Sequence, residues 1–464
     1  MSARDSRQPL YATIWRWHFY AGLLVVPFVL LLAMTGAAYL FKPQVERWEE
    51  RAFQDLPTTH AVTAQAQVAA ALTAFPGARF ASYRLPERHG DAAMIHLGPR
   101  DGRAPRDVFV SPQGAVLGSI APGARLMEWA KRIHGQLLLG KRGSWIVELA
   151  ASWALVLLLS GLYLWWPRGR GLAGVVWPRF GGGRRLFWRD LHAVTGFWVS
   201  GLALVLLVTA LPWAGVWGSA FKAARTEMGW VKGPQDWTLG GEAPAPGGDA
   251  HAGHAAHGGA AMARSMSMTA TGAPQAGLDM IVAKAEAEHL AFPVIVTPPV
   301  APGSPGATGV MAWTVRSDAQ NRPLRTSITY DPATGREIGR DGFADDHVID
   351  RVVGYGIAWH EGQLFGWMNQ LIGVLTTIGL IVMAVSGFAL WRRRKPAGML
   401  GAPPPARVPA RIGGVVAILL VLAAILPLLA ISLMALCLFE WLVLPHLPRA
   451  AQWLGAPSRN AAVG

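Results

Sequence analysis

The chain has 464 residues, of which 52% are hydrophobic and only 15% are charged. This composition excludes an ordinary soluble enzyme and predicts an integral membrane protein that is mainly α-helical. The formal charge of +14 could suggest nucleic-acid binding. The basic residues are instead concentrated in short loops beside apolar runs, which is typical of membrane topology, so no nucleic-acid partner is expected.

Five apolar stretches are long enough to cross a bilayer, which takes about 20 mostly apolar residues. They lie within residues 1–41, 141–166, 191–214, 361–391 and 412–444. Basic loops follow the second and fourth spans, at 167–190 and 392–411. Positive loops remain in the cytoplasm. We therefore expect a bacterial inner-membrane protein with a cytoplasmic N-terminus and a periplasmic C-terminal tail, 445–464.

Two long segments connect these spans on the outer side. Each is predicted to form a small α+β module, in which a helix precedes strands that close on a turn containing Pro and Gly. The modules are residues 42–140, with a helix at 65–75, and residues 276–360, with a helix at 278–290. Residues 215–275 contain a linker rich in Gly, Ala, Pro, His and Met, and this linker is predicted to be disordered.

Four histidines show a repeated spacing. The spacing is 17 residues from His18 to Thr35-Gly36 and from His192 to Thr209-Ala210, and 26 residues from His134 to Ser160-Gly161 and from His360 to Ser386-Gly387. The repeat predicts a duplicated unit of helix, outer module and helix, with a histidine at the head of every helix. One extra C-terminal span completes the five.

The topology decides which of these histidines can meet. Spans one and three both begin at the cytoplasmic face, so His18 and His192 are expected at one depth. His134 and His360 are expected together near the outer face, across most of the roughly 30 Å core. Each pair can supply both axial ligands of a low-spin heme, which suits electron transfer. Four glycines would allow a flat macrocycle to approach: Gly22, Gly135, Gly196 and Gly362.

The single cysteine limits the type of heme. Cys437 lies inside the last span. One cysteine excludes a disulfide framework within the chain, a cysteine-held iron–sulfur cluster and covalent heme attachment through CxxCH. The prediction is therefore two b-type hemes, with His18 and His192 binding the inner one and His134 and His360 binding the outer one. The alternatives are histidines that only cap helices, or a zinc or copper site that lacks further ligands.

Motifs at the helix heads and module ends resemble a known family. The motifs are WHFYAGL, IHGQLLLG, LHAVTGFW and WHEGQLFG, together with the module endings VSPQGAVLG and YDPATGREIG. They are similar to the PepSY-associated transmembrane helix family, which includes inner-membrane ferric-siderophore reductases. The resemblance implies PepSY-like modules and heme ligation by the same four histidines. It also implies an oxidoreductase that reduces a periplasmic ferric siderophore, or another metal chelate, and releases ferrous iron.

The linker contains a second set of possible metal ligands. His251, His254 and His257 are followed by three methionines, and imidazole and thioether ligands suit copper. A cupric reductase of the same architecture is therefore an alternative, and chance enrichment in a flexible linker is another.

Two further classes of function compete with the reductase. A permease for a metal complex would have charged groups or broken helices at mid-membrane, and the spans lack charged residues near their centres. A regulator acting through its modules would leave the four histidines unexplained. The chain has no nucleotide or flavin motif, so we expect electrons to come from quinol or from a separate cytoplasmic reductase.

Overall fold

The computed structural model describes residues 7–98, 104–167, 172–179, 181, 183–230, 276–299, 311–404 and 412–456. The chain divides into two compact units, each assembled from distant parts of the sequence. The helical unit comprises Met1–Ala37, Ile133–Phe221 and Leu371–Gly464, and the sheet unit comprises Ala38–Arg132 and Lys222–Gln370.

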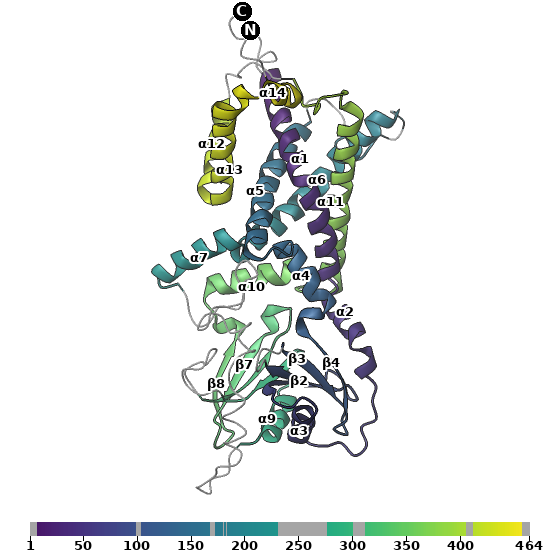
Figure 1. Cartoon of the computed structure of the whole chain (residues 1–464), viewed down its shortest axis with the longest axis vertical. Helices are drawn as coiled ribbons and strands as arrows, with labels where there is room; N and C mark the ends of the chain where they lie inside the picture. Colours follow the sequence, from purple (N-terminus) through teal and green to yellow (C-terminus); the bar gives the residue numbers. More distant parts are fainter. Residues whose placement is uncertain are drawn as a thin grey trace, which may run out of the picture. The chain divides into compact units, whose positions relative to one another are not determined.

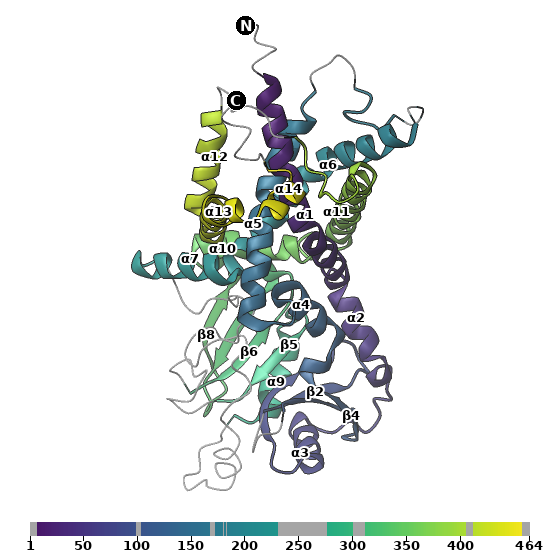
Figure 2. The ribbon, with the colours of Figure 1, turned by 45° about the horizontal axis from the view of Figure 1, so that its top comes forward.

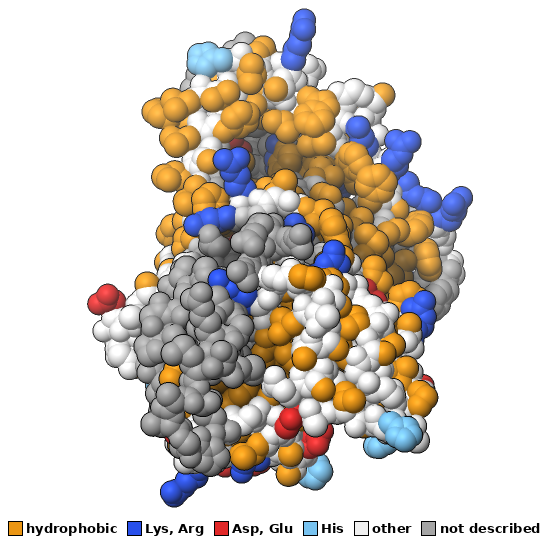
Figure 3. Space-filling view, turned by 60° about the horizontal axis from the view of Figure 1, so that its bottom comes forward, with side chains coloured by type: hydrophobic (Ala, Val, Ile, Leu, Met, Phe, Trp, Pro, Cys, Tyr) orange, Lys and Arg blue, Asp and Glu red, His pale blue; other side chains and the backbone are white. Residues whose placement is uncertain are grey.

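Four long apolar helices form most of the helical unit, and they run beside one another in Figures 1 and 2. They are α1 (Arg7–Tyr39), α5 (Gly140–Trp165), α6 (Gly183–Ala210) and α11 (Trp367–Arg394). Together with Pro427–His446, the described residues contain five helices long and apolar enough to cross a membrane. Hydrophobic side chains cover much of the helical unit in Figure 3. The prediction of a multi-pass membrane protein is confirmed.

The last apolar stretch differs from the single span predicted over 412–444. It contains α12 (Ile412–Ile425) and α13 (Pro427–Leu438), separated at Leu426, which has an extended backbone. Proline at the first position of α13 explains the break, because a proline disfavours helical geometry at the residue before it and readily begins a new helix. At about 1.5 Å per residue, α12 is too short to cross a core of about 30 Å.

The end of the described chain lies beside the start of α1. After α13 come a π-helical turn (Phe439–Val443), a 3₁₀ turn (Leu444–His446) and α14 (Pro448–Leu454). The Arg16 guanidinium donates hydrogen bonds to the carbonyls of Gly455 (2.8 Å) and Pro403 (2.6 Å), and the Tyr20 hydroxyl donates to Leu454. These bonds place the described end of the chain beside α1, whereas the sequence predicted a tail on the side opposite the N-terminus. The break at Leu426 lets the chain return to the end where α1 begins.

This path predicts the outcome of thiol labelling with a reagent that does not cross membranes. In a Cys437→Ala background, Ala397→Cys and Gln452→Cys should react from the same side of the membrane, since the Leu400 amide donates to the Trp453 carbonyl. Lys141→Cys, near the start of α5, should react only from the opposite side. Reaction of Gln452→Cys from the Lys141 side would contradict the returning path.

The sheet unit is built around one antiparallel sheet of eight strands, in the order β4-β3-β2-β1-β5-β6-β7-β8. The strands are β1 (Arg79–Arg84), β2 (Ala93–Gly98), β3 (Arg106–Val110), β4 (Val116–Ile120), β5 (Val294–Thr297), β6 (Trp313–Ser317), β7 (Thr326–Tyr330) and β8 (Glu337–Gly342). The two outer segments meet where β1 pairs with β5, with Tyr83 opposite Val296. Strand β5 was not predicted from the sequence.

A single hydrophobic core joins the two segments. It is formed by buried residues of the sheet and of two helices, α3 (Ala64–Ala74) and α9 (Leu278–Ala287). Ala71 and Ile281 are completely buried on these helices, against Ile95 and Val315 of the sheet. The Gln65 amide of α3 donates a hydrogen bond to Asp279 of α9 at 2.8 Å. Each segment therefore packs against the other as well as against its own strands.

Four shorter helices connect the spans to the rest of the chain. They are α2 (Lys42–Glu49), α4 (Leu126–Gln136), α7 (Gly215–Glu227) and α10 (Val348–His360). The start of α7 is held by Glu148 of α5, whose carboxylate accepts the amides of Val216 and Trp217 at 2.8 and 3.0 Å. A carboxylate at a helix N-terminus satisfies amides that have no partner within the helix.

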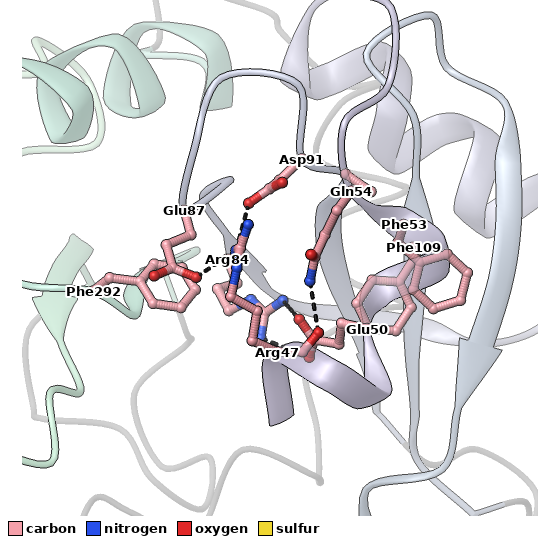
Figure 4. Close-up of a pocket in the computed structure, with 10 residues that line it drawn as sticks. Arg47, Glu50, Phe53, Gln54, Arg84, Glu87, Asp91, Phe109 and Phe292 are labelled. Atoms are coloured by element: carbon pink, nitrogen blue, oxygen red, sulfur yellow. Dashed lines mark hydrogen bonds and ion pairs between the residues drawn. The ribbon is translucent and has the colours of Figure 1, made fainter. Parts of the chain in front are cut away.

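A network of buried charges connects the start of the sheet unit to its strands. Glu50 accepts two hydrogen bonds from Arg84, at 2.6 and 3.1 Å, as Figure 4 shows. It accepts a third from Arg125 at 2.9 Å. Arg125 also contacts Asp107, which receives a hydrogen bond from His96 at 2.7 Å. Each charge has an opposite partner, which offsets the cost of burying it.

This network predicts a loss of stability in acid. Burial alone would raise the pKa of Asp107, but the hydrogen bond from His96 and the Arg125 charge lower it below its ordinary value. Ionised Asp107 therefore stabilises the fold above its unfolded pKa of about 4. That stabilisation is lost as the pH falls through the lowered folded-state pKa. In thermal unfolding measured across this range, Asp107→Asn should flatten the acid side of the stability curve, whereas Asp341→Asn, at an exposed position, should leave it unchanged.

Candidate functional site

The four predicted histidines do not lie at the heads of the spans. His18 and His192 lie well inside α1 and α6, which begin at Arg7 and Gly183. His134 lies near the end of α4, and His360 is the last residue of α10. The sequence predicted both at the heads of span helices, whereas a turn separates α4 from α5 and another separates α10 from α11.

His18 is held by a serine of a neighbouring span. Its Nδ1 lies 2.8 Å from the Ser160 hydroxyl of α5. The next residue, Gly161, passes so close to the imidazole that a Cβ there would lie 3.2 Å from His18 Cε1. The pair Ser160-Gly161 thus provides both a hydrogen-bond partner and space for the ring.

The same arrangement recurs at two other histidines. His192 Nδ1 lies 3.2 Å from the Ser386 hydroxyl of α11 and 3.0 Å from the Met383 carbonyl. A Cβ at Gly387 would lie 3.3 Å from His192 Cε1. His134 Nδ1 lies 3.0 Å from the Thr35 hydroxyl of α1, and a Cβ at Gly36 would lie 3.2 Å from its Cε1.

These contacts favour one tautomer of each ring. The Ser160, Ser386 and Thr35 hydroxyls donate their protons to carbonyls one turn earlier in their own helices, at 2.7, 2.6 and 2.8 Å. A hydroxyl that uses its one proton in this way accepts from the histidine. The Met383 carbonyl can only accept, so Nδ1 of His192 carries the proton. The same assignment for His18 and His134 leaves the lone pair on Nε2, the form in which imidazole binds a metal. Burial also lowers the pKa of His134, which favours the neutral ring.

His18 and His192 lie together in the helical unit. Their ring centroids are 6.5 Å apart, and the ring planes differ by 81°. Two imidazoles that share one metal through Nε2, with metal–nitrogen bonds of about 2 Å, would have centroids roughly 6 Å apart. The spacing therefore fits one metal atom between the two rings. The prediction that this pair meets agrees with the structure.

The His134 ring lies near the other end of α1. Its partner Thr35 is 17 residues beyond His18 on the same helix, which is about 25 Å along a helix with a rise of 1.5 Å per residue. The helical unit therefore holds imidazoles at two depths. His360 belongs to the sheet unit, and its pairing with His134 stays a prediction.

One of the four predicted glycines, Gly135, lies in open surroundings, because a Cβ there would meet no atom within 4 Å. A Cβ at Gly22, a turn after His18, would make an ordinary contact with Leu157 at 3.9 Å. Gly196 lies near the flexible Met383 side chain, at 3.3 Å. Gly362 has a positive φ of 74° and would contact Leu40 at 2.6 Å. Its role is thus to form the turn after α10, and this corrects the prediction of open space there.

Other candidate sites gain no support. The described residues contain no group of three or more His, Cys, Asp and Glu side chains that could hold a metal ion. The possible copper ligands His251, His254 and His257 lie outside the described residues. A small pocket of the sheet unit contains Arg47 and Arg84, and both pair with carboxylates.

The hydroxyl residues were the part of the site that sequence reasoning missed. The dipeptides Thr35-Gly36, Ser160-Gly161 and Ser386-Gly387 helped to define the sequence repeat. In that repeat, each dipeptide was associated with the histidine that precedes it in sequence. The structure instead joins His18 to the serine that follows His134, and His134 to the threonine that follows His18. Only the packing of one helix against another shows this exchange.

One family model, the PepSY-associated TM region, matches residues 15–394. The match includes all four histidines and both outer segments. No curated protein matches the chain. Because the family model covers most of the sequence, the chain belongs to the family of the PepSY-associated TM region, as its motifs predicted.

Proposed function

We propose that this protein carries electrons across the bacterial inner membrane through two b-type hemes and reduces a metal chelate in the periplasm, in the first place a ferric siderophore. The observation that carries the proposal is the set of three histidines with Nδ1 anchored and the lone pair on Nε2, at two depths of one helical unit. Four histidines with matched spacing have no comparable use in a permease or a regulator.

The residues present fit the inner heme. His18 and His192 would hold it, since their 6.5 Å separation suits one shared metal atom. The backbone at Gly22, a turn after His18, is not crowded, since a Cβ there would make only an ordinary contact with Leu157. His134 and His360 would bind the outer heme. Bound heme supplies reversible one-electron transfer, while the protein holds the imidazoles neutral and, with the apolar helices, keeps water away.

The orientation follows from the basic residues. Arg392, Arg393 and Arg394 end α11, and Arg184 and Arg185 begin α6. The segment after α11 contacts Arg16 near the start of α1, so these charges gather at one end of the helical unit. By the positive-inside rule this end is cytoplasmic. Electrons from quinol or a cytoplasmic reductase would enter here, and the His134 end would be the outer one.

The outer segments are inferred to be duplicated PepSY-like modules. The strand order is mirrored about the β1–β5 pair, and in each half a helix precedes the first strand. The modules would form the surface at which the chelate docks. The reaction is the transfer of one electron to each ferric ion, which yields a ferrous ion that hard oxygen donors hold less tightly. No acid, base or nucleophile is needed.

Absorption spectra of the purified protein, oxidised and then reduced with dithionite, test the heme proposal. We expect low-spin b-type bands and two hemes per chain. Protein produced with ample heme that contains none would contradict the proposal.

Stopped-flow mixing tests the substrate. Dithionite-reduced protein, freed of excess reductant, should be reoxidised by a ferric siderophore and yield two ferrous ions per chain to a ferrous-specific chelator. Reoxidation by a cupric chelate but not by ferric chelates would instead favour the cupric reductase.

A further inference from the structure

The hydroxyl–glycine pairs that contact the histidines have a geometry suited to tuning a bound metal. In each of the three pairs, the hydroxyl is on a different helix from the histidine: Ser160 of α5 faces α1, Ser386 of α11 faces α6, and Thr35 of α1 faces α4. Each contact therefore fixes the rotation of an imidazole against a second helix. The glycine beside each hydroxyl prevents the ring from being pushed away.

The direction of these hydrogen bonds gives them an electronic effect. An imidazole that donates its Nδ1 proton to an acceptor has a more basic Nε2 and binds a metal more strongly. The hydroxyl acceptors are polarised further, because each donates its own proton to a backbone carbonyl, and chains of hydrogen bonds strengthen one another. A stronger donor stabilises ferric more than ferrous iron.

From this geometry we infer that Ser160, Ser386 and Thr35 are positioning residues, each of which lowers the reduction potential of one heme. Ser160 and Ser386 act on the heme bound by His18 and His192, and Thr35 acts on the heme bound by His134. The inference rests on the proposed function, since it concerns the same histidines. It extends that function by assigning separate control of the two potentials to three hydroxyl side chains.

The test is a potentiometric titration of the heme bands in single variants of the full-length protein. Ser160→Ala should raise the potential of the inner heme and leave the outer one unchanged, and Thr35→Ala should do the reverse. Ser386→Ala should also raise the potential of the inner heme, but by less, because the Met383 carbonyl still accepts from His192. Loss of such a hydrogen-bond partner typically changes metal affinity by about 10-fold or more. A tenfold change in the preference for ferric over ferrous iron corresponds to about 59 mV for one electron.

Matched variants separate this role from a merely structural one. Ser152, on the same helix as Ser160, makes the same bond to a carbonyl one turn earlier, at 2.8 Å. Ser152→Ala should therefore move neither potential. Thr35→Ser keeps the hydroxyl, so the outer heme should have the wild-type reduction potential rather than that of Thr35→Ala. Gly161→Ala, which brings a Cβ against His18, should alter the inner heme spectrum without removing the hydrogen bond.

The outcomes distinguish the inference from the proposed function. Two hemes with potentials that Ser160→Ala, Ser386→Ala and Thr35→Ala do not move would overturn the inference and leave the di-heme proposal standing. Equal shifts of both hemes in any one variant would also overturn it, because the effect would then not be local. Wild-type protein without heme would overturn both.

Discussion

Replacing His18 by alanine should halve the heme content, from two hemes per chain to one, and stop electron transfer through the membrane. The lost heme should be the inner one, since His18 lies beside His192 with ring centroids 6.5 Å apart. His192→Ala should give the same spectrum as His18→Ala. His134→Ala should lose the other heme, because its anchor at Thr35 is about 25 Å further along α1. Heme-to-protein ratios and potentiometric titration measure both results.

The control is His89→Ala, which removes an exposed histidine of the sheet unit and should keep both hemes. If His18→Ala retained two hemes, His18 would not be a ligand. If His18→Ala and His134→Ala lost the same heme, the assignment of histidines to two depths would be wrong. His360→Ala should match His134→Ala, and this variant tests the pairing that the repeat predicts.

Removing Asp350 should destabilise the protein by about 3–5 kcal/mol, which is typical when one partner of a buried ion pair is lost. Arg225 of α7 is only 1% exposed and forms two hydrogen bonds with Asp350 of α10, at 2.9 and 2.6 Å. It also donates to the Trp230 carbonyl at 2.8 Å. In Asp350→Ala the guanidinium stays buried without its carboxylate. Thermal and denaturant unfolding in detergent measure the loss.

A double-mutant cycle isolates the charge effect. Arg225→Met with Asp350→Leu should recover most of the lost stability, because apolar replacement of both partners is often neutral or stabilising. Glu227→Gln, at an exposed position of the same helix, should change the unfolding free energy by less than about 0.5 kcal/mol. If Asp350→Ala lowered the unfolding free energy no more than Glu227→Gln does, the Arg225–Asp350 pair would contribute little to stability.

The sequence predicted the spans because a membrane-spanning helix needs a long apolar stretch, which can be recognised without knowing the tertiary structure. It failed at the last span because 412–444 is almost entirely apolar up to Glu440, so length alone suggests a single crossing. Pro427 was the residue that indicated a break, but transmembrane helices tolerate proline, so its presence alone did not predict one. Whether it bends or ends the helix depends on packing. Here Leu426 and Leu429 are buried in a cluster with Leu155 of α5.

The candidate site was predictable in part for a similar reason. A histidine in an apolar stretch is a functional candidate because placing a polar side chain inside a membrane costs free energy. The equal spacing of the histidines suggested which of them share a depth in the membrane. The hydroxyl partners depend on which helices are neighbours. Strand β5 was missed because it has only four residues, Val294–Thr297, and because its partner β1 lies more than 200 residues earlier in the chain.

The β1–β5 pairing also constrains how the protein is made. While only the first of the two segments has been synthesised, β1 lacks its neighbour β5, and the hydrophobic core lacks Ile281 and Val296. An unpaired strand edge with exposed apolar surface invites aggregation. The segment must remain in this state while α5 and α6 are synthesised and inserted. The first segment therefore has to be protected until the second is made, and the two halves are not expected to mature as separate polypeptides.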